Sequence, residues 1–152
     1  MPLLVLACIL AGCGGAGNSK WQQVQGGGFS FEAPAGWKVV GATASNGPID
    51  RVQVNAFRLV HAYVHAKQAA AARELDGVAE RLARQLKGTV ASRRTLRVDG
   101  FDARGYSIDH NGLTEEFTFV LRGQREYELL CRRSAGVGDA ACRELVVSFR
   151  AA

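Results

Sequence analysis

Residues 90–131, VASRRTLRVDGFDARGYSIDHNGLTEEFTFVLRGQREYELLC, decide the fold. Three two-residue turn signals interrupt this stretch at regular intervals: Asp99-Gly100, Asn111-Gly112 and Gly123-Gln124. Asp-Gly and Asn-Gly favour type I′ turns and Gly-X favours type II′ turns, and both types match the twist of paired strands. The stretch therefore predicts a four-stranded antiparallel meander. Its expected strands are Val90–Val98, Phe101–His110, Leu113–Arg122 and Arg125–Cys131.

Two-residue turns also fix the register of the strands, so the residues that share a face can be counted outward from each turn. One face receives Tyr106, Phe117 and Leu130. The opposite face receives Leu96, Ala103, Val120, Tyr127, Leu129 and Cys131. Because both faces carry apolar residues, we expect a sheet that is covered on both sides.

Two helices are available to cover these faces. The segment Lys67–Lys87 consists mostly of good helix formers, and Gly88 suits a C-terminal cap. Its apolar stripe is Leu75, Ala79, Leu82 and Leu86. The segment Gly138–Arg150 predicts a second, shorter helix. We therefore expect one helix on each face of the sheet.

The N-terminal half adds strands to this plan. Residues 29–32 alternate apolar and polar side chains, Trp37–Val40 restarts after a Pro-Ala-Gly break, and Arg51–Val60 alternates again after a loop at Gly41–Asp50. The predicted fold is α+β. An antiparallel sheet, built from the C-terminal meander plus N-terminal strands, is sandwiched between a long central helix and a C-terminal helix.

The chain begins with a short apolar run that ends in Leu10-Ala11-Gly12-Cys13. We interpret this tetrapeptide as a lipobox that follows a signal-peptide core. It predicts a signal peptide at 1–12, a lipid-carrying Cys13 with a tether at 13–27, and one domain at 28–152, although Trp21–Gln25 is a candidate edge strand. The uncharged Met1-Pro2 start is atypical of such leaders, and the alternative is a buried N-terminal strand.

The lipobox fixes the expected location. The chain should be extracytoplasmic and lipid-anchored to the cell membrane, or to the outer membrane if the cell has two, because Gly14 replaces the aspartate associated with retention at the inner membrane.

The motif Phe29-x-Phe31-x-x-Pro34-x-Gly36-Trp37, followed by a strand, a long helix, four antiparallel strands and a closing helix, resembles the PsbP/Mog-like fold. That family includes photosystem extrinsic subunits, a Ran-binding import factor and many bacterial lipoproteins. The resemblance implies a lipoprotein with an antiparallel sheet between helices, used mostly as a non-catalytic binding or assembly module.

Cys131 and Cys142 stand apart from the two leader cysteines. In an exported protein such a pair predicts a disulfide, here between the last meander strand and the final helix. Two buried thiols or a redox pair are the alternatives.

A basic run spans the end of the long helix and the following strand in a chain of net charge +5. Its members are Arg81, Arg84, Lys87, Arg93, Arg94 and Arg97. The run is either a solvated face or a contact surface for anionic lipid headgroups or an acidic partner. Nucleic acid is not expected as a partner, because no stacking aromatic residues interleave the arginines.

Candidate ligand sites are few. His61 and His65 are weak candidates for metal ligation, because their spacing would place both on one helix face but no third ligand is evident. Trp37, Tyr63 and Tyr106 could line an apolar pocket between sheet and helix.

No nucleophile–base set is recognisable, and we expect neither an enzyme nor a cofactor. The leading hypothesis is a membrane-anchored binding or assembly module of the cell envelope with a protein partner. A small-ligand carrier that uses the apolar pocket, and an enzyme of unrecognised type, are the alternatives.

Overall fold

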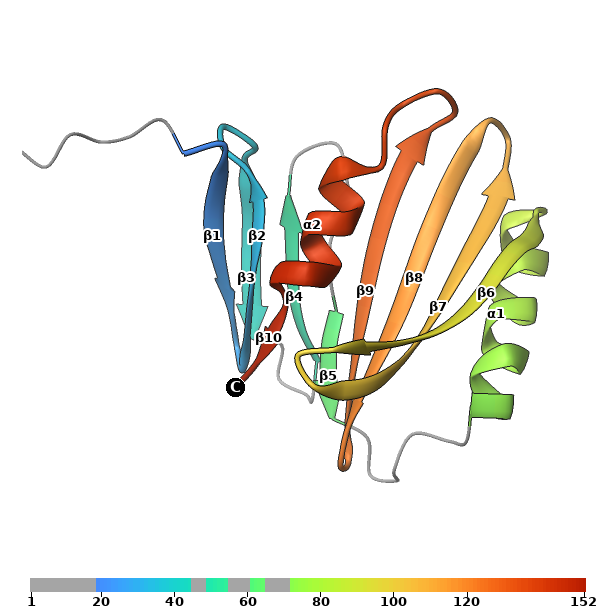
Figure 1. The fold of residues 1–152 in the computed structure, drawn as a ribbon, viewed down its shortest axis with the longest axis horizontal. Coiled ribbons are helices and arrows are strands. Elements are labelled where there is room, and N and C mark those ends of the chain that lie inside the picture. The colour runs from blue at the N-terminus through green and yellow to red at the C-terminus, as the bar shows by residue number, and fades with distance from the viewer. Residues whose placement is uncertain (1–18, 45–48, 55–60, 65–71) are drawn as a thin grey trace, which may run out of the picture.

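The computed structural model describes residues 19–44, 49–54, 61–64 and 72–152, which form two antiparallel sheets and two helices (Figure 1). The elements in chain order are β1 (Trp21–Gly26), β2 (Phe29–Pro34), β3 (Val39–Ala44), β4 (Ile49–Val54), β5 (His61–Val64), α1 (Ala72–Leu86), β6 (Thr89–Val98), β7 (Phe101–His110), β8 (Leu113–Arg122), β9 (Arg125–Ser134), α2 (Ala140–Ser148) and β10 (Arg150–Ala151). The larger sheet has the order β3-β4-β5-β9-β8-β7-β6, and the smaller has β1-β2-β10. Neither described helix has the length and apolarity that crossing a membrane requires.

The predicted meander is confirmed as β6–β9. Asp99-Gly100 has φ angles of 51° and 78°, and Asn111-Gly112 has 47° and 72°, the left-handed pair that a type I′ turn requires. Gly123 has a φ angle of 58° at the third turn. The cross-strand partners at the turns are Val98 with Phe101, His110 with Leu113 and Arg122 with Arg125, as the register count predicted.

The two faces of the larger sheet are covered as expected, with one addition. α1 lies on one face, while α2 and the smaller sheet lie on the other (Figure 1). Under α1 the core holds Tyr106, Phe117 and Leu130 together with Leu75, Ala79 and Ala83 of the helix. Under α2 it holds Ala103, Val120, Tyr127, Leu129 and Cys131, with Leu96 packed against them. The α+β fold class is therefore confirmed.

The smaller sheet changes the expected end of the tether at residue 27 and the expected start of the domain at residue 28. β1 occupies Trp21–Gly26, so the candidate edge strand at Trp21–Gln25 is confirmed and the tether expected at 13–27 ends earlier than residue 27. Val24 of β1 is buried in the core under α2, which explains why this segment pairs with β2. The predicted signal peptide, Cys13 and the first part of the predicted tether lie outside the described residues.

The end of α2 is also corrected. The helix stops at Ser148 rather than Arg150, because Phe149 is extended and fully buried against the rings of Phe29 and Tyr127, at centroid distances of 6.1 and 5.3 Å. The following residues then pair with β2 as β10.

In the N-terminal half, β3 begins at Val39 and continues through Ala44, so its second part occupies the expected loop at 41–50. β4 begins at Ile49, also inside that loop, and its described part ends at Val54. The start of the long helix at Lys67 lies outside the described residues, and its described part is Ala72–Leu86.

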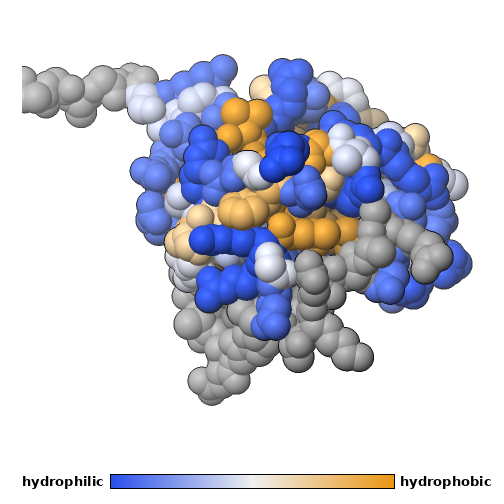
Figure 2. Space-filling view, turned by 60° about the horizontal axis from the view of Figure 1, so that its bottom comes forward, coloured by the Kyte–Doolittle hydropathy of each residue, from blue (hydrophilic) through white to orange (hydrophobic). Residues whose placement is uncertain are grey.

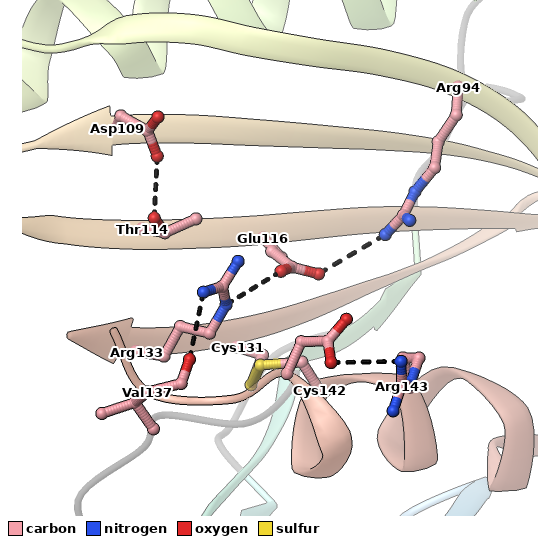
Figure 3. A network of polar contacts seen from close by, with 10 residues as sticks. Arg94, Asp109, Thr114, Glu116, Cys131, Arg133, Val137, Cys142 and Arg143 are labelled. Carbon is pink, nitrogen blue, oxygen red and sulfur yellow. Dashed lines mark hydrogen bonds and ion pairs between the residues drawn. A yellow bond between two sulfur atoms is a disulfide. The ribbon is translucent and has the colours of Figure 1, made fainter. Parts of the chain in front are cut away.

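The disulfide predicted between Cys131 and Cys142 is present, with a Cα–Cα distance of 5.4 Å. It joins β9 to α2, and both cysteines are buried (Figure 3). The bond therefore fastens the short C-terminal helix to the sheet at the core under α2.

The C-terminus of α1 uses a two-residue cap. The amide of Gly88 donates to the carbonyl of Ala83, and the amide of Lys87 donates to that of Arg84, the pattern of a Schellman motif. The left-handed residue is Lys87, with a φ angle of 55°, and not the glycine. A Cβ at Gly88 would lie 2.4 Å from the carbonyl oxygen of Asp109, so the glycine is needed for the close approach of α1 to β7.

We therefore expect Gly88→Ala to lower the free energy of unfolding by about 1–3 kcal/mol, the usual range for overpacking. Lys87→Gly should instead raise it by about 0.5–1 kcal/mol, because glycine adopts the left-handed conformation without a Cβ penalty. Urea denaturation of the two variants beside the unaltered chain measures both. Equal effects of the two substitutions would contradict this assignment of the cap.

Candidate functional site

A hollow of about 230 Å³ lies between the first half of α1 and strands β6 and β7. Its lining residues are Asp76, Arg93, Arg94, Thr95, Arg104 and Tyr106. Four of these six side chains carry charge at neutral pH, so this is a polar site rather than an apolar one.

The floor of the hollow is a block of two cross-strand pairs. Arg93 faces Tyr106, and Thr95 faces Arg104. Directly opposed residues of an antiparallel pair have Cβ atoms about 4.5–5.5 Å apart, and residues two apart on one strand share a face. The register that the turn at Asp99-Gly100 imposes therefore gathers these four side chains on the α1 side of the sheet.

α1 contributes acidic partners from one of its faces. The Tyr106 hydroxyl donates a 2.6 Å hydrogen bond to Oδ1 of Asp76, and Arg93 forms an ion pair with Glu80. Asp76 and Glu80 are four residues apart, so they lie one turn apart on the same side of the helix. These two contacts hold the helix over β6 and β7.

Burial raises the pKa of the Tyr106 hydroxyl above its ordinary value of 10.0, and the hydrogen bond to the Asp76 carboxylate and its charge raise that pKa further. The phenol therefore stays protonated, and its proton is donated in the hydrogen bond to Asp76.

Arg104 is the cation in this hollow that has no partner among the described residues. It is half-buried and makes no ion pair or hydrogen bond within residues 19–44, 49–54, 61–64 and 72–152. Arg93, by contrast, is engaged by Glu80. Arg104 is thus the side chain with which an anionic ligand could form an ion pair.

Arg94 reaches the other face of the sheet. Its side chain passes over Gly105, where a Cβ would lie 2.8 Å from Nε of Arg94, and its guanidinium lies 3.4 Å from Glu116 (Figure 3). Glu116 also binds Nε of Arg133 at 3.2 Å, close to the disulfide. Arg94 therefore lines the hollow and links it to the network under α2.

The structure divides the predicted basic run. Arg81, Arg84 and Lys87 are exposed on α1 and its cap, and none forms an ion pair with the described part of the chain. The three arginines of β6 each have an acidic partner. Those pairs are Arg93 with Glu80, Arg94 with Glu116 and Arg97 with Asp102.

The predicted apolar pocket is not assembled from the residues named for it. Trp37 packs against the core under α2, whereas Tyr106 belongs to the core under α1, on the opposite face of the sheet. Tyr63 lies on β5, in backbone register with Glu126 of β9, and its side chain is outside the described set. Of the three residues named for the pocket, Tyr106 is the one among the described lining residues of the hollow.

His61, the described member of the histidine pair, is not on a helix. His61 lies on strand β5, opposite Glu128, and His65 is outside the described residues. No group of three or more metal-ligating side chains is found in the described part of the chain.

A third histidine has a role that sequence reasoning missed. His110 lies 3.0 Å through Nε2 from Oε1 of Glu115, which also accepts a 2.7 Å hydrogen bond from Nε of Arg132. Glu115 is buried on the α1 side, while the adjacent Glu116 points to the other face. His110 and Glu115 are diagonal neighbours in the β7–β8 register, and that register was the available signal.

We expect Tyr106→Phe to cost about 1 kcal/mol of unfolding free energy at neutral pH, because a net hydrogen bond is lost while the exposed Asp76 carboxylate regains water. The raised pKa gives a further, pH-dependent effect. The unfolded chain ionises this phenol near pH 10 and the folded chain does so only at higher pH, so the contribution is constant below about pH 10 and is lost above it.

Denaturation curves of both chains from pH 7 upward measure this difference. The unaltered chain should lose its advantage over Tyr106→Phe as the pH rises above about 10. Parallel pH profiles would contradict the role of this hydroxyl.

Figure 2 shows hydrophobic residues near the middle of one face, among hydrophilic ones. The exposed large apolar side chains of the described residues are Val39, Val137 and Val147, which lie on β3, before α2 and on α2. Exposed apolar residues that occur singly in this way are normal on protein surfaces.

No protein-family model and no curated protein sequence matches the chain. Among solved structures, the cyanobacterial PsbP (CyanoP) of Synechocystis sp. PCC 6803 is similar in fold, with a TM-score of 0.63. The two sequences are 15% identical, and the match covers 94% of this chain and 99% of the other. The chain therefore has a PsbP-like fold.

Proposed function

We propose that this chain is an extracytoplasmic, lipid-anchored module of the cell envelope that binds or assembles a partner and has no catalytic role. The observation that carries the proposal is the buried Cys131–Cys142 disulfide within a PsbP-like domain. Disulfides of this kind persist in oxidising compartments outside the cytoplasm. The lipobox Leu10-Ala11-Gly12-Cys13 upstream of this domain supplies both the export signal and the anchor.

Lipid modification of Cys13 would hold the domain at the membrane through several acyl chains. Each buried methylene contributes about 0.8 kcal/mol, so two or more chains give stable attachment. The outer membrane is the expected location if the cell has two membranes. Arg81, Arg84 and Lys87 are exposed and form no ion pair with the described part of the chain, so they are available to contact anionic headgroups or an acidic envelope protein.

Cys13→Ser tests the anchor. Membrane fractionation of cells that express the full chain should place the unaltered protein with membranes and the variant in the soluble extracytoplasmic fraction. Cys142→Ala serves as the matched control, because it removes a cysteine but not the lipobox, and it should remain with membranes. Membrane retention of Cys13→Ser in high salt would overturn the anchor.

The hollow bears on the alternative of a small-ligand carrier. At about 230 Å³ and with four charged lining residues, it is smaller and more polar than the ~300–1,000 Å³ apolar pockets of typical small-molecule sites. It therefore favours a small polar ligand over an apolar cargo. The unrecognised enzyme is favoured by no observation in the described residues.

A further inference from the structure

We propose that the hollow between α1 and β6–β7 is a binding site for a glycerophosphate-type group, in which a phosphate contacts Arg104 and neighbouring hydroxyls contact Asp76. This site goes beyond the proposed envelope role and does not depend on the lipid anchor. The glycerophosphate group can come from a free metabolite or from a phospholipid headgroup.

The argument begins with the charge of the lining. The side chains of Arg93 and Arg104 face one aspartate there, and Arg93 is held by Glu80 outside the lining, while Arg94 pairs with Glu116 on the other face of the sheet. Arg104 alone is half-buried with no described partner. Withdrawing a charged group from water without a partner is unfavourable, so an anion that enters the hollow is stabilised first at this side chain.

Phosphate suits the donors around Arg104. A guanidinium presents parallel N–H groups that match the oxygens of a phosphate, and the Thr95 hydroxyl of the cross-strand partner can donate beside it. Arg93, two residues from Thr95 on the same face, adds a second positive charge whose ion pair with Glu80 is about half exposed. An exposed pair of this kind is weak and can be shared with a ligand.

Asp76 determines which groups the ligand must carry beside its phosphate. Its Oδ1 already accepts the Tyr106 proton, and the raised pKa of Tyr106 keeps that proton in place. The carboxylate retains lone pairs that can accept hydrogen bonds only from donors, such as hydroxyls. A bare dianion would meet repulsion from Asp76, whereas a phosphate that carries hydroxyls satisfies both ends of the hollow.

The size of the hollow agrees with a ligand of this class. At about 30 Å³ per water molecule, 230 Å³ corresponds to about seven or eight waters. The site is therefore suited to a compact polar group rather than to a nucleotide or an acyl chain.

The test uses the full chain with Cys13→Ser, so that an acyl anchor cannot contribute to binding. Titration calorimetry measures binding of glycerol 3-phosphate and of inorganic phosphate, and vesicle co-sedimentation compares phosphatidylglycerol with phosphatidylcholine. Arg104→Gln is the site variant. Arg97→Gln is the matched control, because it removes the same charge from β6 outside the hollow.

We expect glycerol 3-phosphate to bind more tightly than inorganic phosphate. Arg104→Gln should weaken that binding about tenfold or more, the effect of losing a charge-assisted hydrogen bond, while Arg97→Gln changes it less than about twofold. Thr95→Val should weaken it severalfold and provides a second site variant. Since Arg104 has no partner among the described residues, Arg104→Gln should not lower the melting temperature of the free chain.

The same experiment distinguishes a free metabolite from a phospholipid headgroup as the source of the glycerophosphate group. Arg104-dependent binding of soluble glycerol 3-phosphate indicates a free ligand, and Arg104-dependent binding of phosphatidylglycerol vesicles without soluble binding indicates a lipid headgroup. The absence of saturable binding to every probe at millimolar concentration overturns the site. Equal weakening by Arg104→Gln and Arg97→Gln also overturns it, because it would show attraction to net charge alone.

Discussion

Replacing Glu115 with alanine is expected to lower the free energy of unfolding by about 2–4 kcal/mol, because it removes the shared acceptor of a buried ionic cluster. The Glu115 side chain is 3% exposed, and its Oε1 binds both His110 and Arg132. After the substitution the imidazole nitrogen of His110, on a side chain that is 8% exposed, has lost its carboxylate partner. Arg132 is 32% exposed and can recover water, which keeps the loss below the upper range for a fully buried pair.

Glu116→Ala is the matched control for this prediction. The two glutamates are neighbours on β8, but Glu116 points to the other face and pairs with Arg94 and Arg133 at 3.4 and 3.2 Å. Those pairs are closer to solvent, so we expect a loss of only about 1 kcal/mol. The two substitutions change net charge equally and differ in burial.

Urea denaturation at constant pH measures both variants. A loss of less than about 1 kcal/mol for Glu115→Ala, or equal losses at the two positions, would show that burial does not strengthen the cluster around His110.

The part of the candidate site that lies on the meander could be predicted from the sequence. The turns at Asp99-Gly100 and Asn111-Gly112 fix which residues are opposed, so the faces of β7 and β8 followed from counting. The same register places His110 diagonal to Glu115, so this contact could also have been found by counting. Register information was sufficient wherever both partners lay on adjacent strands.

The hollow could not be predicted in the same way. Asp76 reaches Tyr106 because α1 crosses β6 and β7 at a particular position and rotation, and these are set by packing of the helix on the core rather than by strand register. The apolar stripe of α1 gives the buried face but not which strand lies beneath each turn. The basic run was visible in the sequence, but Arg104, the cation of the hollow without a partner in the described part of the chain, lies outside it.

The smaller sheet was also beyond local pattern reading. β10 has two residues, Arg150 and Ala151, too few for any alternation to be detected. Its pairing with β2 follows from burial of Phe149, which ends α2 and turns the chain toward Phe29. Long-range packing therefore decided the last helix boundary.

The second large effect is expected from loss of the disulfide. Replacing both Cys131 and Cys142 with alanine should lower the free energy of unfolding by about 3 kcal/mol, the loop-entropy value for cysteines 11 residues apart. The effect should be concentrated at the C-terminus. α2 has nine residues, fewer than the ~12–15 that an isolated helix needs, so its order depends on its attachment to β9.

Hydrogen exchange of the double variant distinguishes local from global loss. Amides of α2 should lose protection, and β10 should follow because Phe149 connects the two, whereas α1 on the opposite face should keep most of its protection. Val147→Ala is the control on α2, since this side chain is 68% exposed and its removal should change stability by less than about 0.5 kcal/mol.

Unchanged protection of α2 in the double variant would show that Leu145 and Phe149 hold the helix without the bond. In that case the disulfide would not be needed for stability. Evidence for an oxidising location would then have to come from finding the bond in protein isolated from its native compartment. Loss of protection confined to α2 and β10 would instead show that the covalent link and the core under α2 act together, because neither the short helix nor its few buried contacts is sufficient alone.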